Sequence, residues 1–386
     1  MCRNFSQESV VSFVNNLKIN VTYGKNIFIM FGNCFNQLNL WLLLRNMKCF
    51  VWWLFKARVK FSYYENILIF IMLNISIIIP LYNASSYLHH SLDTLLSQSF
   101  QDIEIILVDD GSTDESPAIC DEYARKDGRI KVFHEAHSGV AHSRQVGLDH
   151  AIGEYILYVD VDDQVQPDMI SEMYQQAEAQ QADMVFCDYR ELTHHGEVYH
   201  AQKPTALDGV TILDDILNGR LYGALWNKMM RREWLMKTKA SFPQELTMRE
   251  DLIFLSQCLP YAQKIAYIAK AYYGYERRNT SALTSNYLNE SPSYYDQESL
   301  WVSLILKNKS LSNSIRLQLE RYYFKLSYIT LLKGLFDKQL WNERFKSHEN
   351  LLDYGSGFRK TIVSFAFCGH FRIAQFMRSI ISKIKS

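Results

Sequence analysis

Between residues 75 and 187, short apolar runs alternate with amphipathic stretches. The apolar runs predict strands at 75–79, 103–108, 130–133, 155–159 and 184–187. The stretches between them predict helices near 86–98, 115–126, 140–151 and 167–180. Strands alternating with helices indicate parallel βαβ units with right-handed crossovers. Because the strands are apolar on both faces, we expect an α/β fold: a Rossmann-like, mostly parallel sheet flanked by helices.

Beyond about Ser291 the pattern changes to apolar positions three and four residues apart, which predicts helices near 294–309, 315–335 and 338–352. The last segment, 358–385, is both basic and amphipathic. We therefore expect a C-terminal helical region with a basic tail. This tail either packs on its own domain or lies on an anionic membrane surface, and liposome flotation separates the two interpretations.

The first 73 residues show no sustained helical or strand period. Their longest uncharged run, 26–44, contains several Asn and Gln residues and is a poor membrane span. Two hypotheses stay open for this atypical extension. Either it is a membrane-surface anchor that uses Trp41, Trp52 and Trp53, or it is translated upstream sequence and the protein starts at Met72.

Composition places the 386-residue chain among folded globular proteins of two or three domains, with 48% hydrophobic residues and zero formal net charge. That charge gives no reason to expect a nucleic-acid partner. The cysteines are odd in number and have no CxxC or zinc spacing, which favours reduced thiols in a cytoplasmic protein. No acidic residue follows Asp353, so peripheral contact with the inner face of the cell membrane fits this composition.

Carboxylates cluster where two of the predicted strands end. Asp109 and Asp110 follow the second strand, and Asp160 and Asp162 follow the strand at 155–159. Open α/β sheets bind ligands outside the carboxyl ends of their strands, so both clusters point to one site. Asp160 and Asp162 lie on the same side of an extended chain and suit Mn²⁺ or Mg²⁺, which also binds phosphate oxygens. Alternatively, both clusters are ordinary polar turns.

A nucleotide is a candidate ligand for the first cluster, because carboxylates at this position accept hydrogen bonds from a base or a ribose. Tyr82, which follows Pro80 after the first strand, could stack on a nucleobase. An isolated tyrosine in a loop can equally well be a packing residue.

Six ordered motifs resemble those of family 2 glycosyltransferases, which have the GT-A fold. They occupy residues 76–83, 97–100, 106–114, 143–147, 153–156 and 160–163. The resemblance implies that Asp160 and Asp162 form the family's DxD pair, with Asp162 favoured as the direct metal ligand. It also implies that Arg144 lies near the diphosphate or the carboxylates. Gln145 departs from the Asn that many relatives carry after this arginine.

The resemblance extends into the second half of the chain. Residues 226–228 and 231–232 are similar to the family's segment beyond the nucleotide domain, and Glu250-Asp251 looks like its ED motif at a helix start. An inverting enzyme needs a carboxylate base on the far side of the sugar, which implies Asp251 as the base and Glu250 as the second candidate. Alternatively, both acids only complement a helix N-terminus.

The residues implied to bind the nucleotide sugar and its cation are Pro80, Tyr82, Asp109, Asp110, Arg144, Asp160, Asp162 and Arg278. The implied domains are 74–190 for the nucleotide sugar, 191–290 for the acceptor and 291–386 for the helical region. The implied reaction is inverting transfer from a nucleoside diphosphate sugar, with UDP expected, to a saccharide or lipid-linked acceptor in cell-surface polysaccharide biosynthesis.

Three other classes of protein share parts of this pattern. A processive synthase is disfavoured because its Gln-x-x-Arg-Trp motif and membrane spans are missing from the sequence. A nucleotidyltransferase is disfavoured because residues 80–83 are not a Gly-rich loop. A non-catalytic nucleotide-sugar-binding or interaction module with the same fold remains the alternative, although it would not need all of Asp160, Asp162, Glu250 and Asp251.

Overall fold

A computed structural model describes residues 74–279, 291–348, 350–374 and 376. The chain divides into two compact units between Met72 and Leu73, and the described residues belong to the second unit. Both hypotheses for the N-terminal extension therefore fall outside the described residues. So does the part of the basic tail that follows Phe376. None of the described helices is long and apolar enough to cross a membrane.

Nine strands of the described residues form one mixed sheet in the order β3-β2-β1-β4-β8-β6-β9-β5, with β7 paired to β6. The strands are β1 (Ile75–Leu81), β2 (Ile103–Asp109), β3 (Ile130–His134), β4 (Tyr155–Tyr158), β5 (Gln164–Val165), β6 (Met184–Thr193), β7 (Gly196–His200), β8 (Lys228–Arg231) and β9 (Ile265–Glu276). Strands β1 to β4 are parallel to one another, whereas β8 runs antiparallel to both of its neighbours. The expected α/β fold with a mostly parallel sheet is confirmed.

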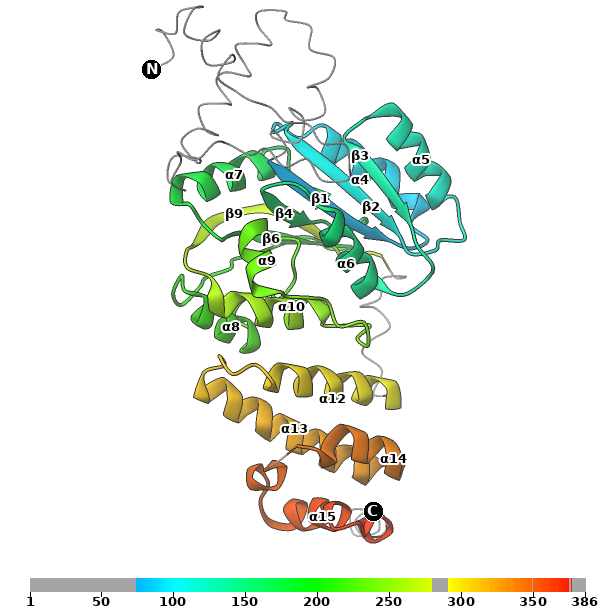
Figure 1. Cartoon of the computed structure of the whole chain (residues 1–386), viewed down its shortest axis with the longest axis vertical. Helices are drawn as coiled ribbons and strands as arrows, with labels where there is room; N and C mark the ends of the chain where they lie inside the picture. The colour runs from blue at the N-terminus through cyan, green and yellow to red at the C-terminus, as the bar shows by residue number, and fades with distance from the viewer. Residues whose placement is uncertain (1–73, 280–290, 349, 375, 377–386) are drawn as a thin grey trace, which may run out of the picture. The chain divides into compact units, whose positions relative to one another are not determined.

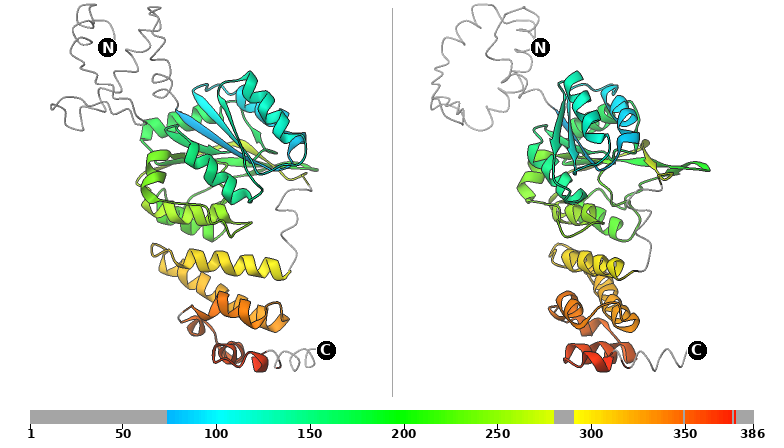
Figure 2. Two further views of the ribbon diagram at one scale, coloured as in Figure 1. Left: turned by 45° about the vertical axis from the view of Figure 1, so that its right-hand side comes forward. Right: turned by 90° about the vertical axis from the view of Figure 1, so that its right-hand side faces the viewer.

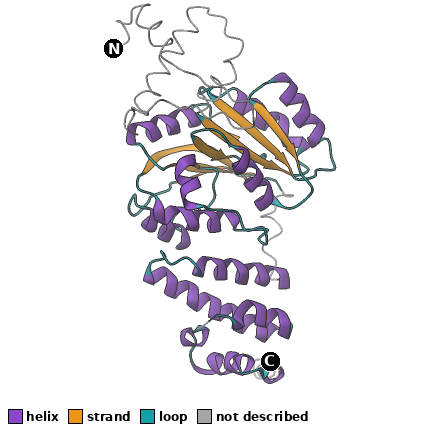
Figure 3. Cartoon of the chain, in the orientation of Figure 1, coloured by secondary structure: helices purple, strands orange, loops and turns teal. Residues whose placement is uncertain are grey.

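The helices of this region are α4 (Ser85–Leu96), α5 (Ser116–Lys126), α6 (Val140–His150), α7 (Met169–Gln180), α8 (Gly209–Leu217), α9 (Arg232–Thr238) and α10 (Glu250–Cys258). They cover both faces of the sheet (Figures 1 and 3). The position of strand β1 between two core clusters explains why its sequence is apolar throughout. Ile77 packs into the core cluster that contains α4, α5 and α7 residues, and Ile78 packs into the cluster with α6 and α10 residues.

The strand order also fixes where a ligand can bind. From β1 the chain moves outward to β2 and β3, and it then returns to β4 on the other side of β1. Such a reversal opens a crevice outside the carboxyl ends of the strands. Asp109 is the last residue of β2, and Asp160 follows β4 by two residues. The sheet therefore places both predicted carboxylate clusters at the same edge.

The expected C-terminal helical region is confirmed in α12 (Pro292–Leu306), α13 (Asn313–Lys333), α14 (Lys338–Trp341) and α15 (Gly357–Phe367) (Figure 2). The side chains of Ser291 and Ser312 cap α12 and α13. The segment predicted as one helix at 338–352 is divided instead. A π-helical turn (Asn342–Lys346) follows α14, and Asn350 then adopts a left-handed φ of 68° before a 3-10 turn.

Candidate active site

The guanidinium of Arg144 joins three carboxylates from distant parts of the sequence. Arg144 lies on α6 and its residue surface is only 5% exposed. Its Nη1 donates to Glu250 and, at 2.7 Å, to Oδ1 of Asp251, and its Nη2 donates at 3.1 Å to Oδ1 of Asp160. The first carboxylate of the DxD pair and both acids of the ED motif therefore meet around one buried charge.

Local structure explains how Glu250 and Asp251 reach this position. Helix α10 begins at Glu250, as the sequence predicted, and Arg249 before it has a left-handed φ of 65°. Both acids thus lie in the first turn, where a negative charge interacts favourably with the helix dipole. A structural role at the helix N-terminus and a role in the site are compatible for these acids. Both carboxylates complement the N-terminus of α10 and also face Arg144.

The environment of Asp251 favours its protonated form. Burial raises the pKa of this carboxyl, and so do the charges of Glu250 and Asp160, while Arg144 and Lys228 act in the opposite direction. The net result is a pKa above the usual range of an aspartate. The side chain keeps 17% of its surface exposed, so a ligand can reach it, and in its deprotonated form the carboxylate can accept a proton from that ligand.

The DxD pair fits a divalent cation in its chemistry. Burial raises the pKa of Asp162, and the nearby charge of Asp160 raises it further, although Asn279 donates to Asp162 at 2.7 Å. A bound cation would offset this concentration of negative charge. In the described ranges no group of three or more His, Cys, Asp or Glu side chains is arranged to hold a metal. The pair would therefore need further ligands, such as the phosphate oxygens of a substrate.

Asp163, which directly follows the DxD pair, fixes the shape of the loop after β4. It is 2% exposed and accepts hydrogen bonds from the Tyr273 hydroxyl at 2.6 Å and from the backbone N–H of Glu276 at 2.7 Å. The same hydroxyl accepts a hydrogen bond from the backbone N–H of Asp160 at 3.1 Å. The roles of Asp163 and Tyr273 were not predicted from the sequence. The only signal was the third aspartate beside the DxD pair.

Lys228 holds a second loop beside the site. It is 2% exposed, and its Nζ donates to the carbonyl oxygens of Tyr222 (2.9 Å) and Ala224 (2.6 Å) and to Oδ1 of Asn227 (2.7 Å). Burial lowers the pKa of this amine to about 7. The loop also carries Trp226, whose ring stacks on that of Tyr273 at 4.4 Å between centroids. Lys228 thus supports, through this loop, the tyrosine that binds Asp163.

We expect a Lys228→Met variant to lose about 1–3 kcal/mol of unfolding free energy, because the buried carbonyl oxygens lose their donor. Urea denaturation of the purified chain measures this loss. The matched control is Lys237→Met, since the Lys237 side chain is 73% exposed and its ion pair with Glu233 lies on the surface. Equal stability of the two variants would show that the ammonium group does not support the loop.

The structure also brings the predicted nucleotide-binding residues to one edge. Oδ2 of Asp109 contacts His134 Nδ1 at 2.9 Å, and Asp110 accepts from the backbone N–H groups of Ser138 (2.8 Å) and Gly139 (2.9 Å). Because Gly139 immediately precedes α6, Asp110 holds the helix that carries Arg144. These bonds also fit the alternative of a structural turn, so nucleotide binding by the two acids stays a prediction.

Tyr82 and Arg278, two of the residues implied to bind the nucleotide sugar, lie at the surface. Tyr82 is 46% exposed and stacks on His137, with 4.3 Å between ring centroids, while Pro80 lies within β1. Arg278 donates to Glu276 at 2.8 Å, and its side chain is 45% exposed. Since the N–H of Glu276 binds Asp163, Arg278 lies in the segment that packs against the DxD run.

Comparison with known proteins is consistent with this geometry. The family model described as "Glycosyl transferase family 2" matches residues 76–238. Glycosyltransferase GlyG of Streptococcus pneumoniae is 30% identical over 278 residues, which cover 67% of this chain and 86% of GlyG. EpsH and EpsJ of Bacillus subtilis, which are named as glycosyltransferases, are each 32% identical over 219 residues. The chain spans a little under two thirds of these two relatives, 63% and 62%.

Among solved structures, residues 1–349 of Staphylococcus aureus TarS, in complex with UDP-GlcNAc, match with a TM-score of 0.59. The match covers 80% of this chain and 92% of that one at 21% identity, and it shows a shared fold. The family model, the similarity to GlyG over most of its length and the ordered motifs around Arg144 agree. The chain therefore belongs to glycosyl transferase family 2 and has the GT-A fold.

Proposed function

We propose that this protein is a metal-dependent, inverting glycosyltransferase. It moves a sugar from a nucleoside diphosphate sugar, with UDP as the expected nucleotide, to a hydroxyl group of a saccharide or lipid-linked acceptor in bacterial cell-surface polysaccharide biosynthesis. The observation that carries this proposal is the bridge made by Arg144, which links Asp160 to Glu250 and Asp251. The proposed donor-binding residue Asp160 and the proposed base Asp251 therefore share one counter-charge.

Asp162 and Asp160 would hold Mn²⁺ or Mg²⁺ together with the diphosphate of the donor. When bound, such a cation stabilises the negative charge that develops on the departing nucleoside diphosphate. Arg144 fixes Asp160 in place through its Nη2. The use of UDP is supported by TarS, a protein with the same fold whose structure contains UDP-GlcNAc.

Asp251 would remove the proton of the acceptor hydroxyl as its oxygen attacks the anomeric carbon. Its Oδ1 accepts the bond from Arg144, and for its Oδ2 the described residues supply no hydrogen-bond donor. Oδ2 is thus available to an acceptor hydroxyl. A single displacement of this kind inverts the anomeric configuration, so an α-linked nucleotide sugar gives a β-glycoside.

We expect UDP-glucose, UDP-galactose or UDP-N-acetylglucosamine to raise the melting temperature of the full chain with Mn²⁺, and excess EDTA to abolish the increase. Asp162→Asn should lose the Mn²⁺-dependent increase and the release of UDP, because the variant lacks a charged metal ligand. Asp149→Asn, an exposed site on α6, is the matched control. Donor stabilisation that persists in EDTA would contradict metal dependence, and the lack of response to any donor would contradict the proposed function.

Peripheral membrane contact and a cytoplasmic location stay predictions. In the described part of the tail, Phe358 and Phe376 are 53% and 65% exposed, and Arg359 and Arg372 are exposed nearby in sequence. Exposed apolar and basic side chains together suit an anionic lipid surface. Three of the four described cysteines are buried, and all four are free thiols, which fits a reducing compartment.

A further inference from the structure

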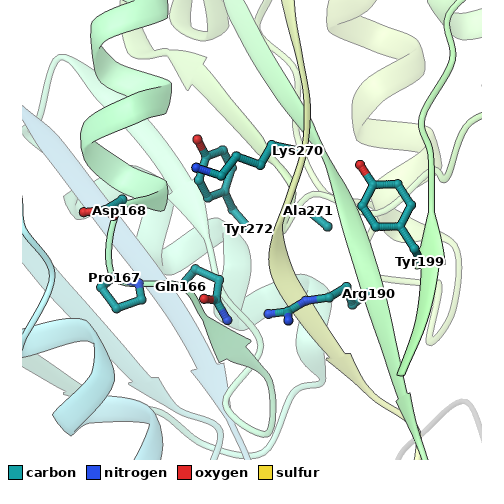
Figure 4. Close-up of a pocket in the computed structure, with 8 residues that line it drawn as sticks. All are labelled: Gln166, Pro167, Asp168, Arg190, Tyr199, Lys270, Ala271 and Tyr272. Atoms are coloured by element: carbon teal, nitrogen blue, oxygen red, sulfur yellow. The ribbon is translucent and has the colours of Figure 1, made fainter. Parts of the chain in front are cut away.

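A pocket of about 260 Å³ lies beside the DxD loop and contains none of the carboxylates described above (Figure 4). Its walls come from four segments: the connection between β5 and α7, and strands β6, β7 and β9. The side chains that matter for its chemistry are Gln166, Asp168, Arg190, Tyr199, Lys270 and Tyr272. It is smaller than the roughly 300–1,000 Å³ typical of sites for drug-sized ligands, so it suits a group the size of one or two sugar rings.

Tyr199 gives the pocket an aromatic wall held in a fixed orientation. The residue is 54% exposed, yet its hydroxyl donates to Oδ2 of Asp188 at 2.5 Å. Asp188 itself is 1% exposed and also accepts from Tyr267 at 2.7 Å. An exposed ring tied to a buried carboxylate keeps a flat apolar surface in place. Such a surface packs well against the C–H face of a pyranose, because both are flat and apolar.

The polar groups of the pocket provide donors and an acceptor. Figure 4 shows the guanidinium of Arg190 and the amide of Gln166 facing each other. Within the described residues, neither Nη2 of Arg190 nor the side-chain amide of Gln166 makes a hydrogen bond. Asp168 occupies the N-cap position of α7 without a side-chain capping bond. Guanidinium, amide and carboxylate groups together match neighbouring hydroxyls, which both donate and accept.

Charge favours a neutral ligand over a phosphate. Arg190 already pairs with Glu197 at 2.9 Å, and the carboxylate of Asp168 would repel an anion. Lys270 contributes a positive charge, but its Nζ lies 4.7 Å from the centroid of the Tyr272 ring. The two cationic side chains are thus offset by two acidic ones. A sugar with free hydroxyls fits this balance better than a phosphorylated group does.

We propose that this pocket is a second saccharide-binding site, which holds a neutral pyranose unit of a bound chain. The identification of that chain as the acceptor rests on the proposed function. The pocket is connected directly to the DxD loop, since Gln166 N–H donates to the Tyr272 carbonyl at 2.9 Å and the next residue, Tyr273, binds Asp163. If the other units of such a chain reach the transfer site, binding in the pocket raises their effective concentration there.

The direct test is saccharide binding by the full chain without any donor. The probes are neutral hexasaccharides of glucose, galactose and N-acetylglucosamine, and their binding is measured by isothermal titration calorimetry. We expect at least one of them to bind. Tyr199→Ala should bind it about fivefold to tenfold more weakly, the loss expected for one aromatic contact. Tyr199→Phe should lose less, because the ring remains but its hydrogen bond to Asp188 is missing. Arg190→Gln should weaken binding as well.

Tyr261→Ala is the matched control, because Tyr261 is 58% exposed and lies outside the pocket. Failure of all three hexasaccharides to bind the wild type would overturn the proposal. Equal binding by the Tyr199→Ala and Tyr261→Ala variants would overturn it too. So would binding of inorganic phosphate to the wild type that is lost in Arg190→Gln. Stabilisation by UDP-sugars, measured on the same samples, tests the proposed function separately, because it does not require this pocket.

Discussion

Replacement of Asp251 by Asn is expected to lower the rate of sugar transfer by about 10²- to 10⁴-fold, the usual contribution of a general base. The amide keeps the shape of the side chain but cannot accept the proton of the acceptor hydroxyl. Donor binding should be retained, since the groups proposed to hold the donor are Asp160 and Asp162. Loss of transfer with intact donor binding separates a base from a group that only complements the helix N-terminus.

The measurements are release of UDP with a transferable acceptor and donor-induced stabilisation of the same variant. Glu245→Gln is the control, because Glu245 is exposed and lies in the loop just before α10. The pH dependence gives a second readout. The base must be deprotonated to act and the pKa of Asp251 is raised, so wild-type activity should fall as the pH drops through this raised value. Wild-type turnover by Asp251→Asn would show that another group is the base.

The parts of the site that could be predicted from sequence are those that local sequence patterns determine. An apolar run that ends in acids marks a strand end, so Asp110 and Asp160 were placed correctly at one edge of the sheet. The start of α10 at Glu250 follows from acids before an apolar stretch. These features depend on residues close together in the chain, and local propensity is enough to find them.

The remaining features depend on contacts between distant elements. Arg144 faces Asp160, Glu250 and Asp251 only because α6, the end of β4 and the start of α10 meet. The sequence left open whether this arginine lies near the diphosphate or near the carboxylates, and the structure shows that it contacts the carboxylates. The burial of Lys228 could not be predicted from the sequence either, because no local pattern distinguishes a buried lysine from a surface one.

The pocket beside the DxD loop was equally invisible in the sequence. Its walls depend on the pairing of β6 with β9, where the register shifts between Cys187 and Tyr189. Such an irregularity bends a strand and redirects its side chains, and it leaves no reliable signal in an apolar run. Tyr199 and Tyr272 line one pocket only after this pairing is made.

Removal of the Arg144 charge should have the largest effect on stability. We expect Arg144→Met to lower the free energy of unfolding by about 3–5 kcal/mol, because three carboxylates lose their buried counter-charge. Arg144→Lys should be affected less, since it keeps the charge but loses the planar group that bridges separate partners. Urea denaturation at pH 8 measures both variants. The control is Arg129→Met, whose partner Asp127 lies two residues away in a partly buried pair with 26% and 25% of the two side chains exposed, and for which about 1 kcal/mol is expected.

The pH dependence of this loss tests its electrostatic origin. Without Arg144, the folded-state pKa of Asp251 rises further above the unfolded value, so the folded chain binds more protons than the unfolded chain between the two values. The stability of the variant therefore increases as the pH falls through this window, and its deficit relative to wild type should be smaller at pH 5 than at pH 8. A deficit of equal size at both pH values would point to lost packing around the arginine. In that case, neutralising the carboxylates would not be the main structural role of Arg144.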